Sequence, residues 1–333
     1  MTDIPTSSDP RSLAFDTLDV FTSAPFAGNP LAVVHLRSAE TNRSSQQQKQ
    51  IIAREFNLSE TVFIHHDESS LSNYDTEHHG TWKIDIFMTN QELPLAGHPV
   101  IGSAWWLAHT YADLQSATLL CKAGPVHIKV DRSVTPFRVA ASMPQALRIL
   151  QAGPNLQDIL QMQRGLVPHT SALQNARPGQ ERFPVVQLVP GMTFALVELP
   201  SGEALDTIAP TPTRVTVPSE EGFIAMYLYT LRREAAKRFT LHTRMIEQFL
   251  EDPATGSAAC TLSGYLALQA VGADASALAD VETPWEFNIT QGEKMGRKSD
   301  IHVKVWIDVE GTIKEIQLGG SAVQVMNGTL WSR

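Results

Sequence analysis

Hydrophobic and polar positions change period several times along this chain, and each period predicts an element. Short apolar or alternating runs typical of β-strands occupy residues 13–21, 31–36, 61–66 and 82–88. The segment 44–55 is rich in Gln, Lys and Arg and predicts an exposed helix that ends near Phe56. We expect residues 1–11 to form a disordered tail and the polar residues 66–81 to form an inserted surface loop.

Two longer segments are apolar on nearly all sides. The first follows Gly97-His98-Pro99 and predicts a helix from about Pro99 to Leu114, because proline near a helix start costs no hydrogen bond. The second lies within EDPATGSAAC and its continuation and predicts a helix from about Gly256 to Val271. Helices without a polar face belong inside a fold, so we expect both to be buried.

The remaining pattern repeats the first half of the chain. It predicts a helix near 155–163 and strands at 117–121, 125–131, 136–142, 185–189, 194–199, 222–230, 238–242, 312–318 and 321–326, with a strand–turn–strand over 285–308. Each half thus has several short strands, one glycine-marked turn, one apolar helix and further strands. The shared Gly-Ser-Ala of IGSAWWL and TGSAACTL supports an internal duplication. The fold expected is α+β, with two curved mixed sheets, each around a central helix.

The two glycine-flanked helix starts, Gly97-His98 and Gly256-Ser257, are candidate anion sites. The first turn of a helix has unpaired N–H groups and a partial positive charge, and glycine lets a ligand approach them closely. The alternative is plain capping, as at any helix. A buried helix end needs a partner for its donors, which favours a ligand here.

Three titratable residues lie beside these starts. Glu60 begins an apolar strand, where it is either a solvent-facing edge residue or a partly buried carboxylate with a raised pKa. Asp252 could be a helix cap, and His98 a structural histidine. Together the three could supply acid–base chemistry.

Other kinds of chemistry find little support. A net charge of −9, with Arg232-Arg233 as the longest basic run, argues against nucleic acid as a partner. The chain has no GxGxxG, GxxxxGK[ST] or GxSxG motif. We interpret Cys121 and Cys260 as buried thiols of a reducing compartment. Six residues could be metal ligands but match no metal spacing, so we expect them in a solvated loop: His65, His66, Asp67, Glu68, His78 and His79.

Neither a signal peptide nor a bilayer span is expected from the pattern. The first residues, MTDIPTSSDPRS, have no apolar core, and no run approaches the roughly 20 apolar residues that cross a bilayer. We therefore expect a cytoplasmic protein without a membrane partner.

Six segments, in order, resemble the PhzF-like (phenazine biosynthesis-like) family, which shares its fold with diaminopimelate epimerase. They are DVFTSAPFAGNPLAVV, FNLSETVFI, ELPLAGHPVIGSA, EDPATGSAAC, QGEKMGRKSDIHV and GGSAVQVMNGTL. The resemblance implies two pseudo-symmetric domains, each a strongly curved, barrel-like sheet around a central helix, with the site in the cleft between them. We expect an N-terminal domain at 12–131 plus 320–333 and a C-terminal domain at 132–319.

The resemblance also assigns roles to residues. The family's catalytic glutamate falls on Glu60, its histidine on His98 and its aspartate on Asp252. The substrate-binding positions that we expect are Ser59, Gly97, Gly256 and Ser257. The implied activity is an isomerase that uses no cofactor or metal and moves a proton on a small carboxylate, in a homodimer.

Differences from related enzymes argue against racemisation by a pair of cysteines. Racemases of this fold use one cysteine at each helix start, but here the first position is Ala96 or His98, and Cys260 lies beyond the second. Where the family usually has Gly-His-Ala-Thr, this chain has Gly97-His98-Pro99-Val100, which could alter the rim of the pocket. Two alternatives stay open: a non-catalytic small-molecule-binding protein of the same fold, and a racemase or epimerase with non-thiol bases.

Overall fold

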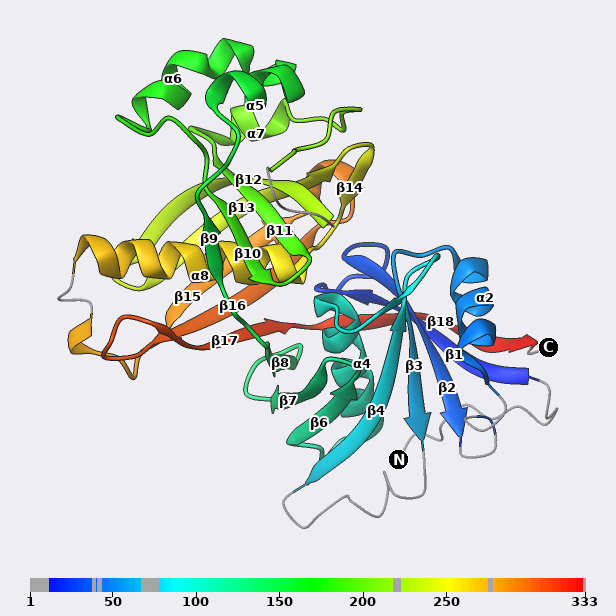
Figure 1. Ribbon diagram of the computed structural model, residues 1–333. Coiled ribbons are helices and arrows are strands. Elements are labelled where there is room, and N and C mark those ends of the chain that lie inside the picture. The colour runs from blue at the N-terminus through cyan, green and yellow to red at the C-terminus, as the bar shows by residue number, and fades with distance from the viewer. Residues whose placement is uncertain are drawn as a thin grey trace. The chain divides into compact units, whose positions relative to one another are not determined.

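Two structural units share the chain. The computed structural model describes residues 12–37, 40, 44–66, 78–217, 223–274 and 278–331. Unit 1 comprises Met1–Ser142 with Leu318–Arg333, and unit 2 comprises Met143–Gln317. Figure 1 shows the elements of both.

Unit 1 is a curved mixed sheet. Its strands are β1 (Ser12–Val20), β2 (Asn29–Arg37), β3 (Thr61–His66), β4 (His79–Phe87), β5 (Glu92–Leu93), β6 (Ser116–Cys121), β7 (Gly124–Asp131), β8 (Arg138–Ser142) and β18 (Ala322–Trp331). β18, β1 and β2 pair antiparallel, β2 pairs parallel with β3, and β3 pairs antiparallel with β4. β4 pairs antiparallel with β5 and parallel with β6, and β6, β7 and β8 continue antiparallel.

The helix α4 (Gly97–Thr110) is enclosed by this sheet. All its residues except His109 are buried, and it contacts β1, β2, β3, β6, β8 and β18 (Figure 1). An apolar stripe on one side would suffice for a surface helix, so apolar residues all round match its place inside the sheet. Gly102 allows the close approach, since a Cβ there would lie 2.4 Å from Cδ2 of Leu31.

The helix α2 (Gln46–Phe56) covers the outer face of the same sheet. Ser45 caps it by accepting from the Gln48 N–H at 3.2 Å, and Asn57 ends it in the left-handed conformation. The prediction that this helix is exposed is wrong in part. Ile52 and Ala53 pack with Phe63 and Phe87, and Lys49 is buried with them.

A buried ion pair explains why this polar sequence lies against a sheet. The ammonium of Lys49 donates to Asp85 Oδ2, which also accepts from His65 Nε2 at 2.8 Å. A charge can be buried when it is paired and hydrogen-bonded. Hydrophobic periodicity alone therefore underestimates how far α2 is buried.

Unit 2 pairs its strands in the same order and sense. Its strands are β9 (Arg148–Leu150), β10 (Val185–Val189), β11 (Met192–Glu198), β12 (Phe223–Ala235), β13 (Arg238–Glu247), β14 (Leu250–Asp252), β15 (Trp285–Gln291) and β16 (Ser299–Ile307), with β17 (Ile313–Gly320) at the unit boundary. β9, β10 and β11 pair antiparallel, β11 pairs parallel with β12, and β12 antiparallel with β13. β13 pairs antiparallel with β14 and parallel with β15, and β15 antiparallel with β16.

The central helix of unit 2 is α8 (Gly256–Ala273), which contacts β10, β11, β15 and β16. A second core lies under short helices between β9 and β12. These helices are α5 (Leu156–Met162), η1 (Arg164–His169), α6 (Thr170–Asn175) and α7 (Gly202–Asp206). A short turn, η3 (Glu293–Met295), follows β15.

The repeated pairing confirms the pseudo-symmetric α+β fold, and it corrects the register of the duplication. α4 begins at Gly97 and α8 at Gly256, after the short strands β5 and β14. ELPLAGH (92–98) therefore corresponds to EDPATGS (251–257), and the Gly-Ser-Ala match, which pairs Gly102 with Gly256, is out of register by five residues. Gly102 is instead a packing position inside its helix.

Candidate active site

Glu60 stands directly before β3, at the edge of the enclosed core of unit 1. Its side chain is 16% exposed, so it is not a solvent-facing edge residue. Burial raises the pKa of Glu60 from 4.5 to about 7, although a hydrogen bond with the Ser59 side chain opposes the rise. Both protonation states are thus populated near neutral pH, as a group that gives and takes a proton requires.

His98 lies next to this carboxyl. It is the second residue of α4, it is 5% exposed, and its Nδ1 is 3.5 Å from Glu60 Oε2. The strand start before β3 and the start of α4 therefore meet, although 38 positions separate them in the sequence. The pair combines a carboxyl with a raised pKa and an imidazole at the positive end of a helix.

The first turn of α4 has no side-chain cap. The preceding residue is Ala96, whose methyl group can accept no hydrogen bond, and Gly97, His98 and Pro99 are all buried. First-turn N–H groups that are not capped by a side chain can receive an anion. This start has the properties that an anion site needs.

In unit 2, Asp252 ends β14 and leads into the turn before α8. Its Oδ2 accepts from the hydroxyl of Thr255 at 2.6 Å. Thr255 is the N-cap residue of α8 and would ordinarily accept from the first turn of the helix, but its side chain makes no such capping bond. Gly256 and Ser257, both buried, form the first turn of α8.

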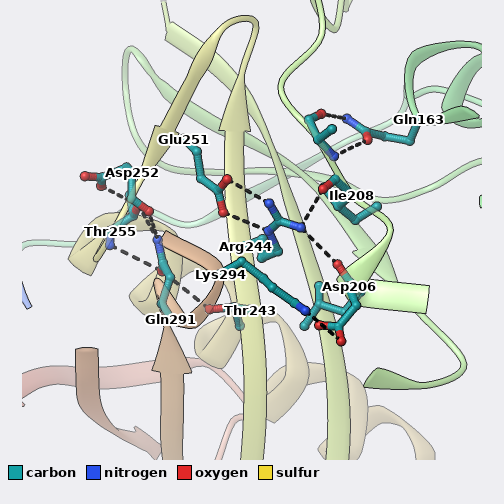
Figure 2. A network of polar contacts seen from close by, with 12 residues as sticks. Gln163, Asp206, Ile208, Thr243, Arg244, Glu251, Asp252, Thr255, Gln291 and Lys294 are labelled. Carbon is teal, nitrogen blue, oxygen red and sulfur yellow. Dashed lines mark hydrogen bonds and ion pairs between the residues drawn. The ribbon is translucent and has the colours of Figure 1, made fainter. Parts of the chain in front are cut away.

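Gln291 is a residue of this site that sequence reasoning missed. It ends β15 and is 1% exposed, and its amide bonds to the turn that carries Asp252 (Figure 2). The available signal was the QG of QGEKMGRKSD, a polar residue ending an apolar strand before a glycine turn. Only the pairing of β15 beside β13 brings it to Asp252.

Arg244 holds the hairpin of β13 and β14, which ends in Asp252, on the side away from Gln291 (Figure 2). Its guanidinium makes two bonds of 2.7 Å to Glu251, and it donates to the carbonyl oxygens of Leu205 and Ile208. Such a fork is among the stronger hydrogen-bonded ion pairs in proteins. It ties the strand that ends in Asp252 to α7.

The histidines expected in a solvated loop lie elsewhere. His65 and His66 end β3 and are 1% and 7% exposed. His66 Nε2 lies 3.0 Å from His35 Nδ1, and His35 Nε2 lies 2.8 Å from Asp16, which also accepts from Trp106 at 2.7 Å. Burial, followed by nearby positive charges, lowers the pKa of His66 to about 3. This network packs against the later turns of α4, so the prediction of a solvated loop is wrong for both.

Of the other four candidate ligands, the structure describes His78 and His79. His78 is half-exposed beside Asp113, and His79 bonds to Ser116 and Thr118. Asp67 and Glu68 lie outside the described residues. Within the part of the chain that the structure describes, no group of three or more His, Cys, Asp or Glu residues could hold a metal ion.

Both cysteines are free, and neither begins a central helix. Cys260 is fully buried within α8, and burial raises its pKa. Cys121 ends β6 and is only partly buried, contrary to expectation; burial and then Asp85 raise the pKa of its thiol to about 12. Neither environment favours a thiolate. Among the described helices, none has both the length and the apolar character of a bilayer span.

Comparison with known proteins now gives the family. A family model described as phenazine biosynthesis-like protein matches residues 18–328. An uncharacterized isomerase of Mesorhizobium japonicum is 32% identical, with 94% of this chain and 97% of the relative covered. A trans-2,3-dihydro-3-hydroxyanthranilate isomerase of Pseudomonas chlororaphis is 29% identical, with 94% and 97% covered.

A solved structure supports the fold. The crystal structure of a Bacillus anthracis phenazine biosynthesis protein of the PhzF family superposes with a TM-score of 0.72 at 20% identity, covering 96% of this chain and 99% of that one. The family resemblance found in the sequence motifs is thus confirmed. This protein is an isomerase that belongs to the phenazine biosynthesis-like PhzC-PhzF family.

Proposed function

We propose that this isomerase moves a proton on a small cyclic or amino-acid-derived carboxylate, without a cofactor, with Glu60 as general acid and base. One observation carries the proposal: a buried carboxyl with a pKa of about 7 lies 3.5 Å from His98, at the start of α4. A group whose pKa lies close to the working pH is the most efficient at exchanging a proton with carbon.

The reaction needs no oxidant or reductant. Ionised Glu60 takes a proton from a substrate C–H, and the electron pair left on carbon shifts through an adjacent double bond. The protonated Glu60 then returns the proton to a different carbon. Exclusion of water would protect this step, because solvent exchange would otherwise compete for the proton.

The other predicted site residues would bind and orient the substrate. The N–H groups at Gly97, Gly256 and Ser257 would receive its carboxylate, because uncapped helix starts attract anions. His98 and Asp252 would position the substrate or relay protons, and Ser59 would hold Glu60. That both units contribute to one site, as the family resemblance implies, remains part of this proposal.

A proton shift by one carboxyl fits the duplicated halves better than racemisation does. In the corrected register, the position in unit 2 that corresponds to Glu60 is Ala225, so the second half has no matching carboxyl. A racemase with non-thiol bases would need a second base opposed to Glu60. The non-catalytic alternative leaves a buried carboxyl with a raised pKa unexplained, and such groups cluster at functional sites.

The relatives suggest a first substrate to test. Trans-2,3-dihydro-3-hydroxyanthranilate, named for the Pseudomonas chlororaphis relative, is a cyclic amino carboxylate. Turnover should be followed by NMR in D2O with the wild type and with Glu60→Gln, and then with a panel of cyclic and amino-acid-derived carboxylates. Glu55→Gln is a matched control, because Glu55 is an exposed glutamate of the preceding helix.

We expect Glu60→Gln to slow isomerisation and deuterium incorporation by about 100-fold or more, and Glu55→Gln to leave both unchanged. Near-wild-type rates in Glu60→Gln would show that another group moves the proton. Carboxylate binding without isomerisation of any member of the panel would favour the non-catalytic alternative. Inversion of a stereocentre would favour the racemase.

We also propose that the protein is a homodimer, since two-fold dimers are the commonest oligomers and the family resemblance implies one. Light scattering after gel filtration should give twice the chain mass of 36.6 kDa. A mass of one chain across micromolar concentrations would contradict the dimer.

A further inference from the structure

The amide of Gln291 closes the turn between β14 and α8 from both sides. Its Nε2 donates to the Asp252 carbonyl oxygen at 2.8 Å and to Thr255 Oγ1 at 3.0 Å. Its Oε1 accepts from the Thr255 N–H at 3.3 Å. One buried side chain thus joins Asp252, which carries the carboxylate, to Thr255, the N-cap residue of α8 (Figure 2).

Two backbone groups, the Thr255 N–H and the Asp252 carbonyl, fix which way this amide faces. The hydroxyls of Tyr227 and Thr243 also lie within hydrogen-bonding distance of Oε1, at 3.1 and 3.4 Å, and 3.0 Å from each other. Tyr227 is fully buried. An amide turned over would set its NH2 against the Thr255 N–H and its oxygen against the Asp252 carbonyl, two contacts between like partners. Gln291 is therefore held in one orientation.

This orientation determines what the hydroxyl of Thr255 can do. A hydroxyl has one proton to donate. The Thr255 proton goes to Asp252 Oδ2, at 2.6 Å, because an ionised carboxylate can only accept. The Gln291 amide takes a lone pair of Thr255 Oγ1 that would otherwise be available to the first turn of α8. The carboxylate is held by this bond, and the cap hydroxyl is kept away from the first-turn N–H groups of α8.

The backbone at Gly292, next to Gln291, lies close to the turn that follows Asp252. Gly292 has φ +77°, and a Cβ on it would lie 2.7 Å from the carbonyl oxygen of Pro253. Only glycine permits both this conformation and this approach. The end of β15 is thus pressed against the turn that follows Asp252.

The duplicated half shows that the fold does not require this polar network. In the corrected register, hydrophobic side chains or a thiol occupy every matching position of unit 1. Val62 corresponds to Tyr227, Ile84 to Thr243, Leu93 to Asp252, Ala96 to Thr255 and Cys121 to Gln291. Unit 1 forms the same turn and helix start without the polar set, so architecture alone does not account for it.

We propose that Gln291 is a positioning residue that acts through Thr255. It directs the Thr255 hydroxyl onto Asp252 and so keeps both that carboxylate and the uncapped start of α8 available to the substrate. This inference rests on the proposed function, in which Asp252, Gly256 and Ser257 contact the substrate.

The test compares Gln291→Met, which keeps the length but removes the amide, with Gln163→Met. Gln163 is a matched control, because it is 2% exposed in the same unit and its amide also bridges a backbone N–H and C=O, those of Ala209. Thr255→Val is the second variant. The whole protein is used, and anthranilate serves as the carboxylate probe.

Two readouts separate positioning from general stability. The first is the shift of the Gly256 and Ser257 amide resonances on titration with anthranilate, which gives an affinity. The second is the carboxyl 13C titration of Asp252, which needs no ligand. We expect Gln291→Met to weaken anthranilate about tenfold and to move the Asp252 titration. Thr255→Val should do the same, and Gln163→Met should do neither, at a similar loss of melting temperature.

The combined variant Gln291→Met/Thr255→Val should be no weaker than either single variant, because both act through one hydrogen bond. Wild-type affinity and an unchanged Asp252 titration in Gln291→Met would overturn the inference while leaving the proposed function intact. If the wild type itself shows no shift at Gly256 and Ser257, the proposed anion site fails, and the Asp252 titration alone then decides the role of Gln291. If Gln291→Met does not fold, Thr255→Val decides by the same readouts.

Discussion

At the residue scale, two buried carboxyl groups show that hydrogen-bond and ion-pair partners decide whether burial raises the pKa. Burial would raise the pKa of Asp85, but hydrogen bonds from His65 and Lys49 outweigh it and hold that pKa well below its usual range. The neighbours of Glu60 are the Ser59 hydroxyl and the His98 ring; burial outweighs the Ser59 hydrogen bond and raises the pKa of Glu60 to about 7. The sequence could mark Glu60 as unusual for a strand start, but it could not show which partners each buried carboxyl would have.

The raised pKa of Glu60 predicts a pH-dependent stability. The folded protein holds a proton on Glu60 that the unfolded chain releases, so stability falls as pH rises from 4.5 to about 7. Glu60→Gln removes this loss. At pH 8 we expect the free energy of unfolding of the variant to exceed that of the wild type by up to about 3 kcal/mol. This follows from about 1.4 kcal/mol for each pH unit between the pKa values of 4.5 and about 7. At pH 4 we expect almost no difference, because Glu60 is protonated in both states.

Urea unfolding at several pH values measures this difference. His66 acts oppositely, since its pKa, lowered to about 3, makes stability rise with pH up to about 6.5. Subtracting the wild type at each pH removes that contribution. A difference between Glu60→Gln and the wild type that stays constant from pH 4 to 8 would rule out the raised pKa.

At the scale of elements, the sequence predicted best where one period governs a whole segment. The apolar helices near 99 and 256 and the strand at 61–66 were found because burial on all sides leaves an unmistakable pattern. The hydrophobic pattern did not predict β5 and β14, because strands of two and three residues are too short to show a period. It also failed for α2, where a buried lysine is indistinguishable in sequence from an exposed one.

The buried Lys49–Asp85 pair under α2 should therefore contribute far more to the free energy of unfolding than a surface ion pair does. Lys49→Met leaves Asp85 buried without its lysine, and we expect a loss of about 3 kcal/mol or more in free energy of unfolding. Lys83→Met is the control: Lys83 lies 3.8 Å from the same carboxylate but is 57% exposed, so its loss should stay below about 1 kcal/mol. Equal losses in chemical denaturation would mean that the buried pair does not anchor α2.

At the scale of the whole molecule, two copies of one architecture carry different chemistry. The half with Glu60 and His98 has hydrophobic side chains and the thiol of Cys121 where the other half holds the polar network around Asp252. The repeated order of predicted strands and apolar helices indicated the duplication, but the Gly-Ser-Ala match misplaced its register. Strand pairing supplies the register, because it aligns positions by hydrogen bonds where few identities survive.

The positions of the two cysteines in the two halves predict that neither thiol is needed for isomerase activity. Neither Cys121 nor Cys260 starts a central helix, and the pKa of each thiol is raised. We expect Cys121→Ser/Cys260→Ala to keep isomerase activity within about threefold, because a thiol that stays protonated is a poor base. Measured with the substrate found by the carboxylate screen, a loss of 100-fold or more with the fold intact would point to thiol chemistry.

The most direct test of Glu60 as the proton carrier is the titration of its own carboxyl group. Carboxyl 13C NMR of glutamate-labelled wild type, with the resonance assigned by its absence in Glu60→Gln, follows that carboxyl through pH 3 to 9 without any substrate. We predict a midpoint of about 7. A midpoint at the ordinary value of 4.5 would leave Glu60 permanently ionised at neutral pH and would contradict its proposed role as both acid and base.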